Sequence, residues 1–149
     1  LRATLHDQVT RSIAAGARVA LGCALPARPG FFYPPSVLTG VAPGMAAFDE
    51  ELFGPLAALV EARDEAHALA LANASPYGLG AAVFTRDDVR GLHLAEHALE
   101  AGSVAVNAFV RSDPRLPFGG IGDSGYGREL GRHGIHELVN VKTVFVSVS

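Results

Sequence analysis

The stretch from residue 81 to residue 106, AAVFTRDDVRGLHLAEHALEAGSVAV, contains two short apolar runs with a longer amphipathic run between them. Ala81 to Phe84 and Ser103 to Val106 are typical of strands, and Arg86 to Glu100 is typical of a helix. A helix that joins two neighbouring strands makes a right-handed crossover, which leaves the strands parallel. The stretch therefore predicts an α/β fold with a mainly parallel sheet and flanking helices.

The predicted helix over residues 86–100 has an apolar and a polar side. Thr85 and Asp88 form a capping-box pattern at its start, and its apolar face holds Val89, Leu92, Ala95 and Leu99. On the polar side, His93 and His97 have the H-x-x-E-H spacing of some zinc sites. Because they belong to a polar stripe that water can solvate, the sequence predicts no metal site here.

The remaining segments continue the alternation of strands and helices. A helix at the start of the chain has one apolar face, formed by Leu1, Leu5, Val9 and Ile13. The other expected elements are a strand over Ala17 to Leu21, an extended connection over Pro26 to Pro35, a buried strand over Leu56 to Val60, a helix from the N-cap Asp64 to about Asn73, and a helix over Arg128 to Leu138.

The last ten residues of this pattern, Val139 to Val148, alternate between apolar and polar for most of their length. Such a run is typical of a strand with one covered face. At a chain end, it can add to the sheet edge of another subunit. It can equally form an edge strand of its own sheet, and both alternatives stay open at this point.

Composition and charge exclude several classes of function. Of the 149 residues, 49% are hydrophobic and 18% are charged, as in a globular domain. A net charge of −3 without a basic stripe argues against a nucleic-acid partner. No apolar run reaches the roughly 18 residues that span a bilayer, which argues against a membrane protein.

Cys23, the single cysteine, cannot form an internal disulfide, which favours a cytoplasmic setting. We expect it to fill a turn rather than act as a nucleophile.

Two further segments combine glycine with functional side chains. Gly120 to Gly125 matches G-x-G-x-x-G, but Pro117-Phe118 precedes it instead of a strand, so a closely packed loop is favoured over a dinucleotide fingerprint. Glu50 to Pro55, EELFGP, places two acids and an aromatic ring before a rigid Gly-Pro turn. A carboxylate there can accept two hydrogen bonds from a ribose diol, and the ring can cover the sugar or its base. From the chemistry of these residues alone, a solvated acidic loop is the favoured interpretation.

Four segments, taken in order, resemble motifs of the aldehyde dehydrogenase superfamily. They are EELFGP at 50–55, ANASPYGLGA at 72–81, LEAGSVAVN at 99–107, and PFGG at 117–120 followed by SGYGRE at 124–129. The resemblance covers essentially the whole chain. It implies the C-terminal portion of that family's catalytic domain over residues 1–127, and a C-terminal helix with an oligomerisation strand over residues 128–149.

The resemblance also implies roles for individual residues. Glu51 would bind the nicotinamide ribose of NAD or NADP, and Phe53 would pack near the nicotinamide. Asn107 would border the substrate pocket, and Phe118 would line it.

The loop from Asn107 to Leu116 is most similar to that of bacterial succinate-semialdehyde dehydrogenases. This implies that Ser112 helps to hold the carboxylate of succinic semialdehyde, the expected small-molecule substrate. A hydroxyl is a suitable donor to a carboxylate, and Arg111 or Arg115 could add a charge-assisted contact.

The family's nucleophilic cysteine and general-base glutamate would lie upstream of Leu1, so none of the catalytic residues is expected in this chain. In the complete enzyme, a cysteine thiolate would attack the aldehyde. Since Leu1 stands within helix-like sequence and no initiator Met precedes it, we expect a fragment. We predict no aldehyde oxidation by the chain alone, and a homo-oligomer through Val139 to Val148 as part of the full-length enzyme. The alternative is a stand-alone, non-catalytic module that pairs with a full-length subunit.

Overall fold

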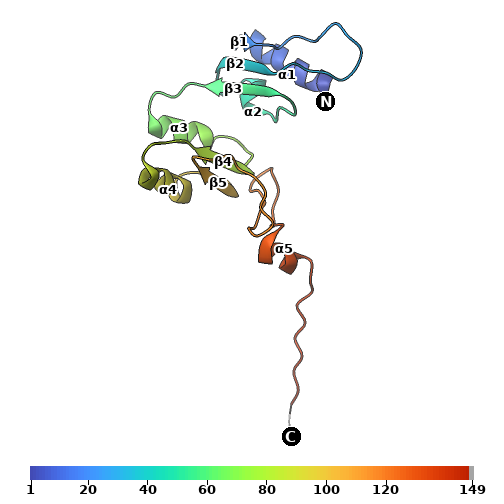
Figure 1. Ribbon diagram of the computed structural model, residues 1–149, viewed down its shortest axis with the longest axis vertical. Helices are drawn as coiled ribbons and strands as arrows, with labels where there is room; N and C mark the ends of the chain where they lie inside the picture. Colours follow the sequence, from blue (N-terminus) through green and yellow to red (C-terminus); the bar gives the residue numbers. More distant parts are fainter. Residues whose placement is uncertain (148–149) are drawn as a thin grey trace. The chain divides into compact units, whose positions relative to one another are not determined.

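The computed structural model describes residues 1–147 of the chain. The chain divides into two compact units, Leu1–Ser75 and Pro76–Ser149, and Figure 1 shows the elements of each. The boundary predicted after residue 127 concerns a different division, between a catalytic domain and a C-terminal extension, and it stays a prediction. None of the helices within residues 1–147 combines the length and the apolar character that crossing a membrane requires.

The first unit contains a three-stranded sheet packed against helix α1. The strand order is β1-β2-β3, with β1 antiparallel and β3 parallel to the central strand. Its elements are α1 (Arg2–Ala14), β1 (Arg18–Leu21), β2 (Ser36–Val41), α2 (Ala46–Asp49), β3 (Leu56–Val60) and α3 (Glu65–Ala72). The prediction of α1, β1, β3 and α3 is confirmed to within a few residues, and β2 and α2 are additions to it.

Strand β2 was not predicted, because its alternation of inward-facing and outward-facing residues is interrupted. Gly40 has a φ of 63°, and the pairing with β3 shifts register between Leu38 and Val41. Such an irregularity interrupts the period of two on which a sequence-based prediction depends. Helix α2 has only four residues, which is too short for a helical repeat to appear.

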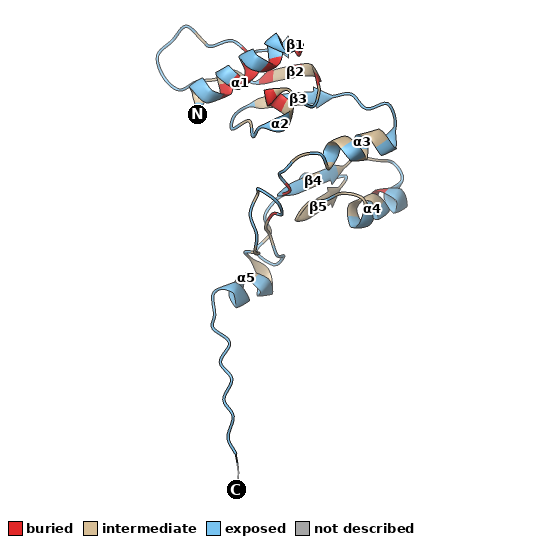
Figure 2. Cartoon of the chain, turned by 180° about the vertical axis from the view of Figure 1, so that it is seen from behind, coloured by how far each residue is buried: buried red, intermediate tan, exposed pale blue. Residues whose placement is uncertain are grey.

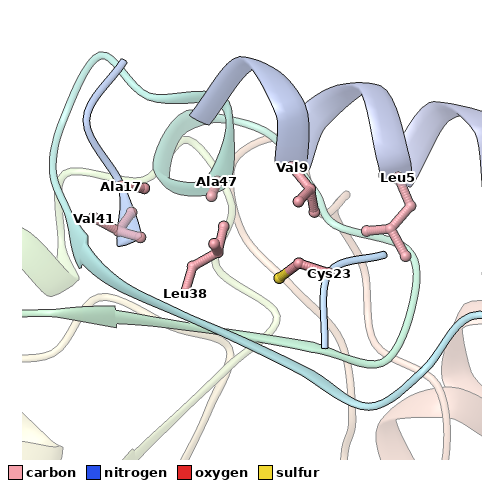
Figure 3. Packing of buried hydrophobic residues seen from close by; sticks show 7 residues of the cluster. All are labelled: Leu5, Val9, Ala17, Cys23, Leu38, Val41 and Ala47. Carbon is pink, nitrogen blue, oxygen red and sulfur yellow. The ribbon is translucent and has the colours of Figure 1, made fainter. Parts of the chain in front are cut away.

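The core of the first unit lies between α1 and β2, as Figure 3 shows. Leu5 and Val9 point from α1 into the cluster that also holds Leu38 of β2, and all three residues are at most 2% exposed. The other members of the cluster are Ala17, Cys23, Val41 and Ala47. The predicted apolar face of α1 is thus confirmed at its centre, whereas its end residues Leu1 and Ile13 are exposed.

The second unit is built on the predicted strand–helix–strand stretch. Strands β4 (Gly80–Val83) and β5 (Ser103–Val106) pair in parallel through four residue pairs, and helix α4 (Asp88–His97) connects them. Gly91 brings α4 close to the sheet, since a Cβ added there would lie 2.8 Å from a Val106 methyl carbon. The predicted parallel crossover is therefore confirmed. A last helix, α5 (Gly131–Glu137), begins three residues later than predicted.

The N-cap of α4 was predicted wrongly, and its predicted apolar face is buried only in part, since Ala95 and Leu99 are half-buried. Asp87, not Thr85, is the N-cap, because its carboxylate accepts a hydrogen bond from the backbone N–H of Arg90 at 2.9 Å. The Thr85 hydroxyl accepts instead from the N–H of Asp87 at 3.1 Å. Val89 and Leu92 of the predicted apolar face are 82% and 53% exposed. Short polar side chains compete for the same capping position, and the sequence pattern did not distinguish them.

Two further expectations concern exposed segments. Strand β3 was expected to be buried, yet Leu59 and Val60 are exposed, and the strand alternates between intermediate and exposed residues for most of its length. Residues 140–147 form no strand within this single chain, so the alternative of an edge strand of its own sheet finds no support there. Pairing with another subunit stays a prediction, and Val148 lies outside the described residues.

Candidate functional site: an anchored acidic turn and a loop cavity

The acidic turn at residues 50–55 follows directly on α2 and is anchored through its first acid. Both carboxylate oxygens of Glu50 accept hydrogen bonds from the Arg11 guanidinium, at 2.7 and 2.9 Å. The amide of Gln8 donates a further bond to Glu50 at 2.9 Å and another to the backbone carbonyl of Glu51 at 3.2 Å. The Glu50 side chain is therefore committed to α1.

The charges of this cluster stabilise one another. Hydrogen bonds from Arg11 and then Gln8 lower the pKa of the Glu50 carboxyl to about 2. The same contact with Glu50, followed by one with Asp7, raises the pKa of Arg11 above its ordinary value. Glu50 is thus ionised at every pH at which the protein is expected to work.

Glu51 and Phe53, the predicted cofactor residues, are exposed, whereas the Glu50 side chain is bound to α1. Glu51 is exposed, and within residues 1–147 its carboxylate accepts no hydrogen bond. Phe53 is 65% exposed. Gly54 lets this turn approach α1, because a Cβ added there would lie 2.3 Å from a methyl carbon of Leu5. The turn presents an exposed carboxylate and ring from an anchored backbone, and the cofactor roles of Glu51 and Phe53 stay predictions.

Asn107, at the end of β5, holds the start of α4. Its backbone is left-handed, with a φ of 52°. Its side-chain oxygen accepts from the Thr85 N–H, and its amide nitrogen donates to the Asp88 carboxylate, both at 2.9 Å. Both ends of this side chain are therefore engaged in joining β5 to the β4–α4 connection. Its place at the border of a substrate pocket stays a prediction.

A cavity of about 170 Å³ lies between β5 and the loop that follows it. Its lining includes Phe118, Phe109 and Arg111, and the role of Phe118 in a substrate pocket stays a prediction. Phe109 packs edge-on against Phe84 at the end of β4, with ring centroids 5.6 Å apart. Ser112, the predicted carboxylate ligand, is exposed and is not part of this lining.

The two arginines of this loop differ in their partners. Arg115 is paired with Asp113 through two side-chain hydrogen bonds, at 2.6 and 2.9 Å. This pairing, with a further bond from the Arg115 N–H, lowers the pKa of Asp113 to about 2. Arg111 lies at the cavity and, within residues 1–147, makes no hydrogen bond or ion pair. Arg111 also acts electrostatically on Asp113, but unlike Arg115 it is not held there by a hydrogen bond.

The glycine-rich loop after Phe118 is a packing element. Phe118 and Glu129 exchange two backbone hydrogen bonds of 2.8 Å, which close the loop at its base. Arg128 donates from one guanidinium nitrogen to the carbonyls of Gly120 and Gly127. Gly102 allows the loop to touch the start of β5, since an added Cβ would lie 1.8 Å from the carbonyl oxygen of Gly119. The interpretation as a closely packed loop is supported.

Sequence reasoning missed the anchoring residues on α1 and the partner of Arg115. Gln8 and Ser12 are 5% and 0% exposed, and they stand four residues apart beside the apolar face of Leu5 and Val9. Two polar residues at helical spacing next to a core face are a signal that such groups bind a neighbouring segment. Their partners, however, lie more than thirty residues away in the chain.

The other candidates from the sequence are not drawn into this site. The His93 and His97 rings contact each other edge-on at 5.0 Å, and within residues 1–147 no group of three or more potential ligands surrounds a metal position. Cys23 is buried in the core with a φ of 67°, in the turn after β1.

Comparison with known proteins assigns the family. The sequence profile of the Aldehyde dehydrogenase family matches residues 2–144, which is nearly the whole chain. This chain belongs to the aldehyde dehydrogenase family. The family resemblance of the four sequence motifs is therefore confirmed, and so is the α/β fold with parallel and mixed sheet pairing.

Several enzymes of the family are similar to this chain. The Escherichia coli K12 succinate semialdehyde dehydrogenase [NAD(P)+] Sad is 48% identical over 97% of the chain, and the Mycobacterium leprae succinate-semialdehyde dehydrogenase [NADP(+)] is 44% identical over 98%. Among solved structures, Gox0499, studied for its cofactor and substrate selection, has a TM-score of 0.91 at 42% identity over 98% of the chain. A Mycobacterium tuberculosis aldehyde dehydrogenase in complex with NAD+ has a TM-score of 0.85 at 35% identity over 91%.

The chain spans only part of these relatives. It covers 31% and 32% of the two succinate-semialdehyde dehydrogenases, and 32% and 28% of the two solved structures.

Proposed function

We propose that residues 1–149 form the C-terminal third of an NAD(P)-dependent aldehyde dehydrogenase that oxidises succinic semialdehyde to its carboxylic acid. The observation that carries this proposal is the acidic turn, which commits Glu50 to α1 and leaves Glu51 and Phe53 exposed. Similarity of 44–48% to succinate-semialdehyde dehydrogenases supports the same substrate class.

The exposed side of the acidic turn fits a nicotinamide nucleotide. The Glu51 carboxylate can accept a hydrogen bond from each hydroxyl of a ribose diol, and Phe53 can cover the sugar or the nicotinamide ring. When bound, NAD(P)+ supplies the acceptor for the hydride that leaves the aldehyde. The role of this chain is to orient the cofactor. Glu51 and Phe53 can do so because the turn that carries them is anchored to α1.

The loop cavity fits the substrate. Phe118 and Phe109 provide apolar walls, and Arg111 provides a positive charge for the far carboxylate of succinic semialdehyde. We assign Ser112 as a hydroxyl donor from the same loop and Asn107 as the residue that borders the pocket. Arg115 is a weaker candidate, because Asp113 already neutralises it.

The chain alone is expected to be inactive. Cys23, its single cysteine, is buried in the core of the first unit, so we assign the nucleophile and the general base to residues upstream of Leu1 in the full-length enzyme. We expect a cytoplasmic homo-oligomer, with a catalytic portion over residues 1–127 and a C-terminal helix and oligomerisation strand over 128–149.

A second possibility is a stand-alone module that pairs with a full-length subunit. Residues 140–147 favour it, because they form no strand of their own, and their large apolar side chains are exposed, namely Val141, Val144, Phe145 and Val146. Co-purification with a full-length subunit, weakened when Val144 and Val146 are both changed to Lys, would support this role. Unchanged pairing of that double variant would contradict it.

The cofactor assignment is tested in a full-length enzyme that carries residues 1–149 in place of the matching third of the Escherichia coli relative. Glu51→Gln removes a charged acceptor, so we expect the KM for NAD(P)+ to rise about tenfold or more. Glu61→Gln removes the same charge from an exposed position outside the turn and serves as the matched control. Equal KM values in the two variants would contradict the role of Glu51.

The substrate assignment is tested in the same enzyme with two aldehydes. Arg111→Met is expected to raise the KM for succinic semialdehyde about tenfold and to leave that for uncharged butanal nearly unchanged. Arg115→Met is the matched control, because its partner is Asp113. A larger effect of the Arg115 change would transfer the role to that residue.

A further inference from the structure

We propose that Arg11 and Gln8 of helix α1 are positioning residues for the cofactor carboxylate of Glu51. This inference rests on the proposed function, since it concerns how the acidic turn is held in the geometry that NAD(P)+ requires.

The first part of the anchor is the contact between Arg11 and Glu50. Two guanidinium nitrogens meet the two carboxylate oxygens, and this bidentate geometry fixes orientation as well as distance. The third guanidinium nitrogen, Nε, donates to Asp7 one helical turn earlier, at 2.8 Å. The Arg11 side chain is therefore also hydrogen-bonded to its own helix while it binds the turn.

The second part of the anchor is the Gln8 amide, which reaches the residue next to Glu50. Its nitrogen carries two hydrogens, and it donates to the Glu50 carboxylate and to the Glu51 backbone carbonyl. Gln8 is only 5% exposed, so its side chain has little freedom to move. The backbone from which the Glu51 side chain projects is therefore tied directly to α1.

Neighbouring contacts leave the turn few other positions. The buried Ser12 hydroxyl accepts from the N–H of Ala47 at 2.8 Å, which joins α2 to α1. The Asp49 carboxylate accepts from the N–H of Gly44 at 3.0 Å. The close approach of Gly54 to Leu5 fixes the other end of the turn. Glu51 thus projects from a backbone that is held on both sides.

The anchor is expected to act on binding more than on stability. The side chains of Arg11 and Glu50 are 50% and 42% exposed, and ion pairs with such exposure contribute little to the free energy of folding. A ligand group held in its binding conformation before the ligand arrives spares the cost of ordering it. Loss of the anchor should therefore weaken cofactor binding while the fold persists.

The test uses the full-length enzyme that carries residues 1–149, with NAD(P)+ as the varied substrate. Arg11→Met and Gln8→Leu are each expected to raise the KM for the cofactor about fivefold, with a smaller change in kcat and in the melting temperature. Arg11→Lys keeps the charge but not the bidentate geometry, so we expect it to restore only part of the affinity. Arg63→Met, an exposed arginine outside the turn, is the control.

The outcomes separate this inference from the proposed function. If Glu51→Gln raises the KM for the cofactor and Arg11→Met does not, the positioning role is wrong and the function stands. If Glu51→Gln has no effect, the cofactor role of Glu51 and the positioning role of Arg11 and Gln8 are both wrong.

A second measurement covers the case in which a variant fails to assemble. Hydrogen exchange of the peptide over residues 49–55 in the 149-residue chain should accelerate in Arg11→Met and stay unchanged in Arg63→Met. Equal exchange of this peptide in both variants would overturn the anchor.

Discussion

The two units of this chain bury very different kinds of residue. In the first, eight hydrophobic residues are less than a tenth exposed, together with the polar Gln8, Ser12 and Ser36. In the second, the buried residues within 76–147 are all glycines, namely Gly78, Gly91 and Gly120. Figure 2 shows this contrast as red segments in α1, α2 and β2, against mostly blue and tan segments in the second unit.

The contrast shows that one unit is held by side chains and the other by its backbone. The first has an apolar cluster that can stabilise it in water. The second depends on close approach of backbone segments and on hydrogen bonds around its glycine-rich loop. Several of its large apolar side chains are exposed, including Val89 at 82% and Leu92 at 53%.

The largest effect is expected from removing a core side chain. Leu38→Ala, at a fully buried position in β2, should lower the free energy of unfolding of the first unit by about 2–5 kcal/mol. Leu92→Ala, at a half-exposed position in α4, should change the free energy of unfolding of the second unit by less than about 0.5 kcal/mol. Urea unfolding followed by circular dichroism measures both. Equal losses would contradict the contrast between the units.

A smaller effect is expected from adding one methyl group to the second unit. Gly102→Ala would place a carbon against the backbone oxygen of Gly119, and such overpacking costs about 1–3 kcal/mol. Hydrogen exchange over residues 117–129 should accelerate. Gly125→Ala is the control, because its surroundings are open and only its φ of 107° opposes the change. If the control had the larger effect, close backbone packing would not hold this unit together.

The helix caps should contribute similarly in both units. Asp64→Ala and Asp87→Ala each remove a carboxylate that accepts from a helix N–H, at a cost of about 1 kcal/mol. Thr85→Ala should cost less, since Thr85 lies outside the cap of α4. Helix content measured by circular dichroism in a urea series tests the order. A loss for Thr85→Ala that exceeds the loss for Asp87→Ala would restore the cap predicted from sequence.

The smallest effect on the free energy of unfolding is expected from lowering the pH. The pKa of Glu50 is lowered from 4.5 to about 2, and that of Asp113 from 3.8 to about 2. A lowered carboxyl pKa contributes stability above its unfolded value, and this contribution is lost as the pH falls toward 2. Arg11→Met should flatten this dependence in the first unit, and Arg115→Met in the loop of the second. NMR titration of the two carboxyls checks it, and ordinary pKa values for both would contradict the contacts.

The local order of apolar and polar residues predicted those helices and strands whose pattern lies within one short stretch of sequence. The parallel crossover from β4 through α4 to β5 could be predicted because both strands and their helix lie within 27 residues. Strand β2 could not, because its bulge breaks the alternation around Gly40. Helical periodicity can identify an apolar face, but it cannot predict whether another segment covers that face. The exposure of Val89 was therefore not predictable.

The candidate site shows the same limit. The EELFGP motif indicated Glu51 and Phe53, and the structure leaves both exposed. The anchor of the turn was not predictable, because Arg11 and Glu50 are 39 residues apart and meet only after folding. Likewise, sequence left Arg111 and Arg115 as equal candidates, and they are distinguished by the contact of Arg115 with Asp113 and by the place of Arg111 in the cavity lining.

The most direct test of the central claim is the rate at which the full-length enzyme carrying residues 1–149 reduces NAD(P)+ in the presence of succinic semialdehyde. We expect activity within about tenfold of the parent Escherichia coli enzyme, a barrier difference of about 1.4 kcal/mol, and no activity from the 149-residue chain alone. A folded full-length enzyme that binds NAD(P)+ but oxidises no succinic semialdehyde would contradict the claim.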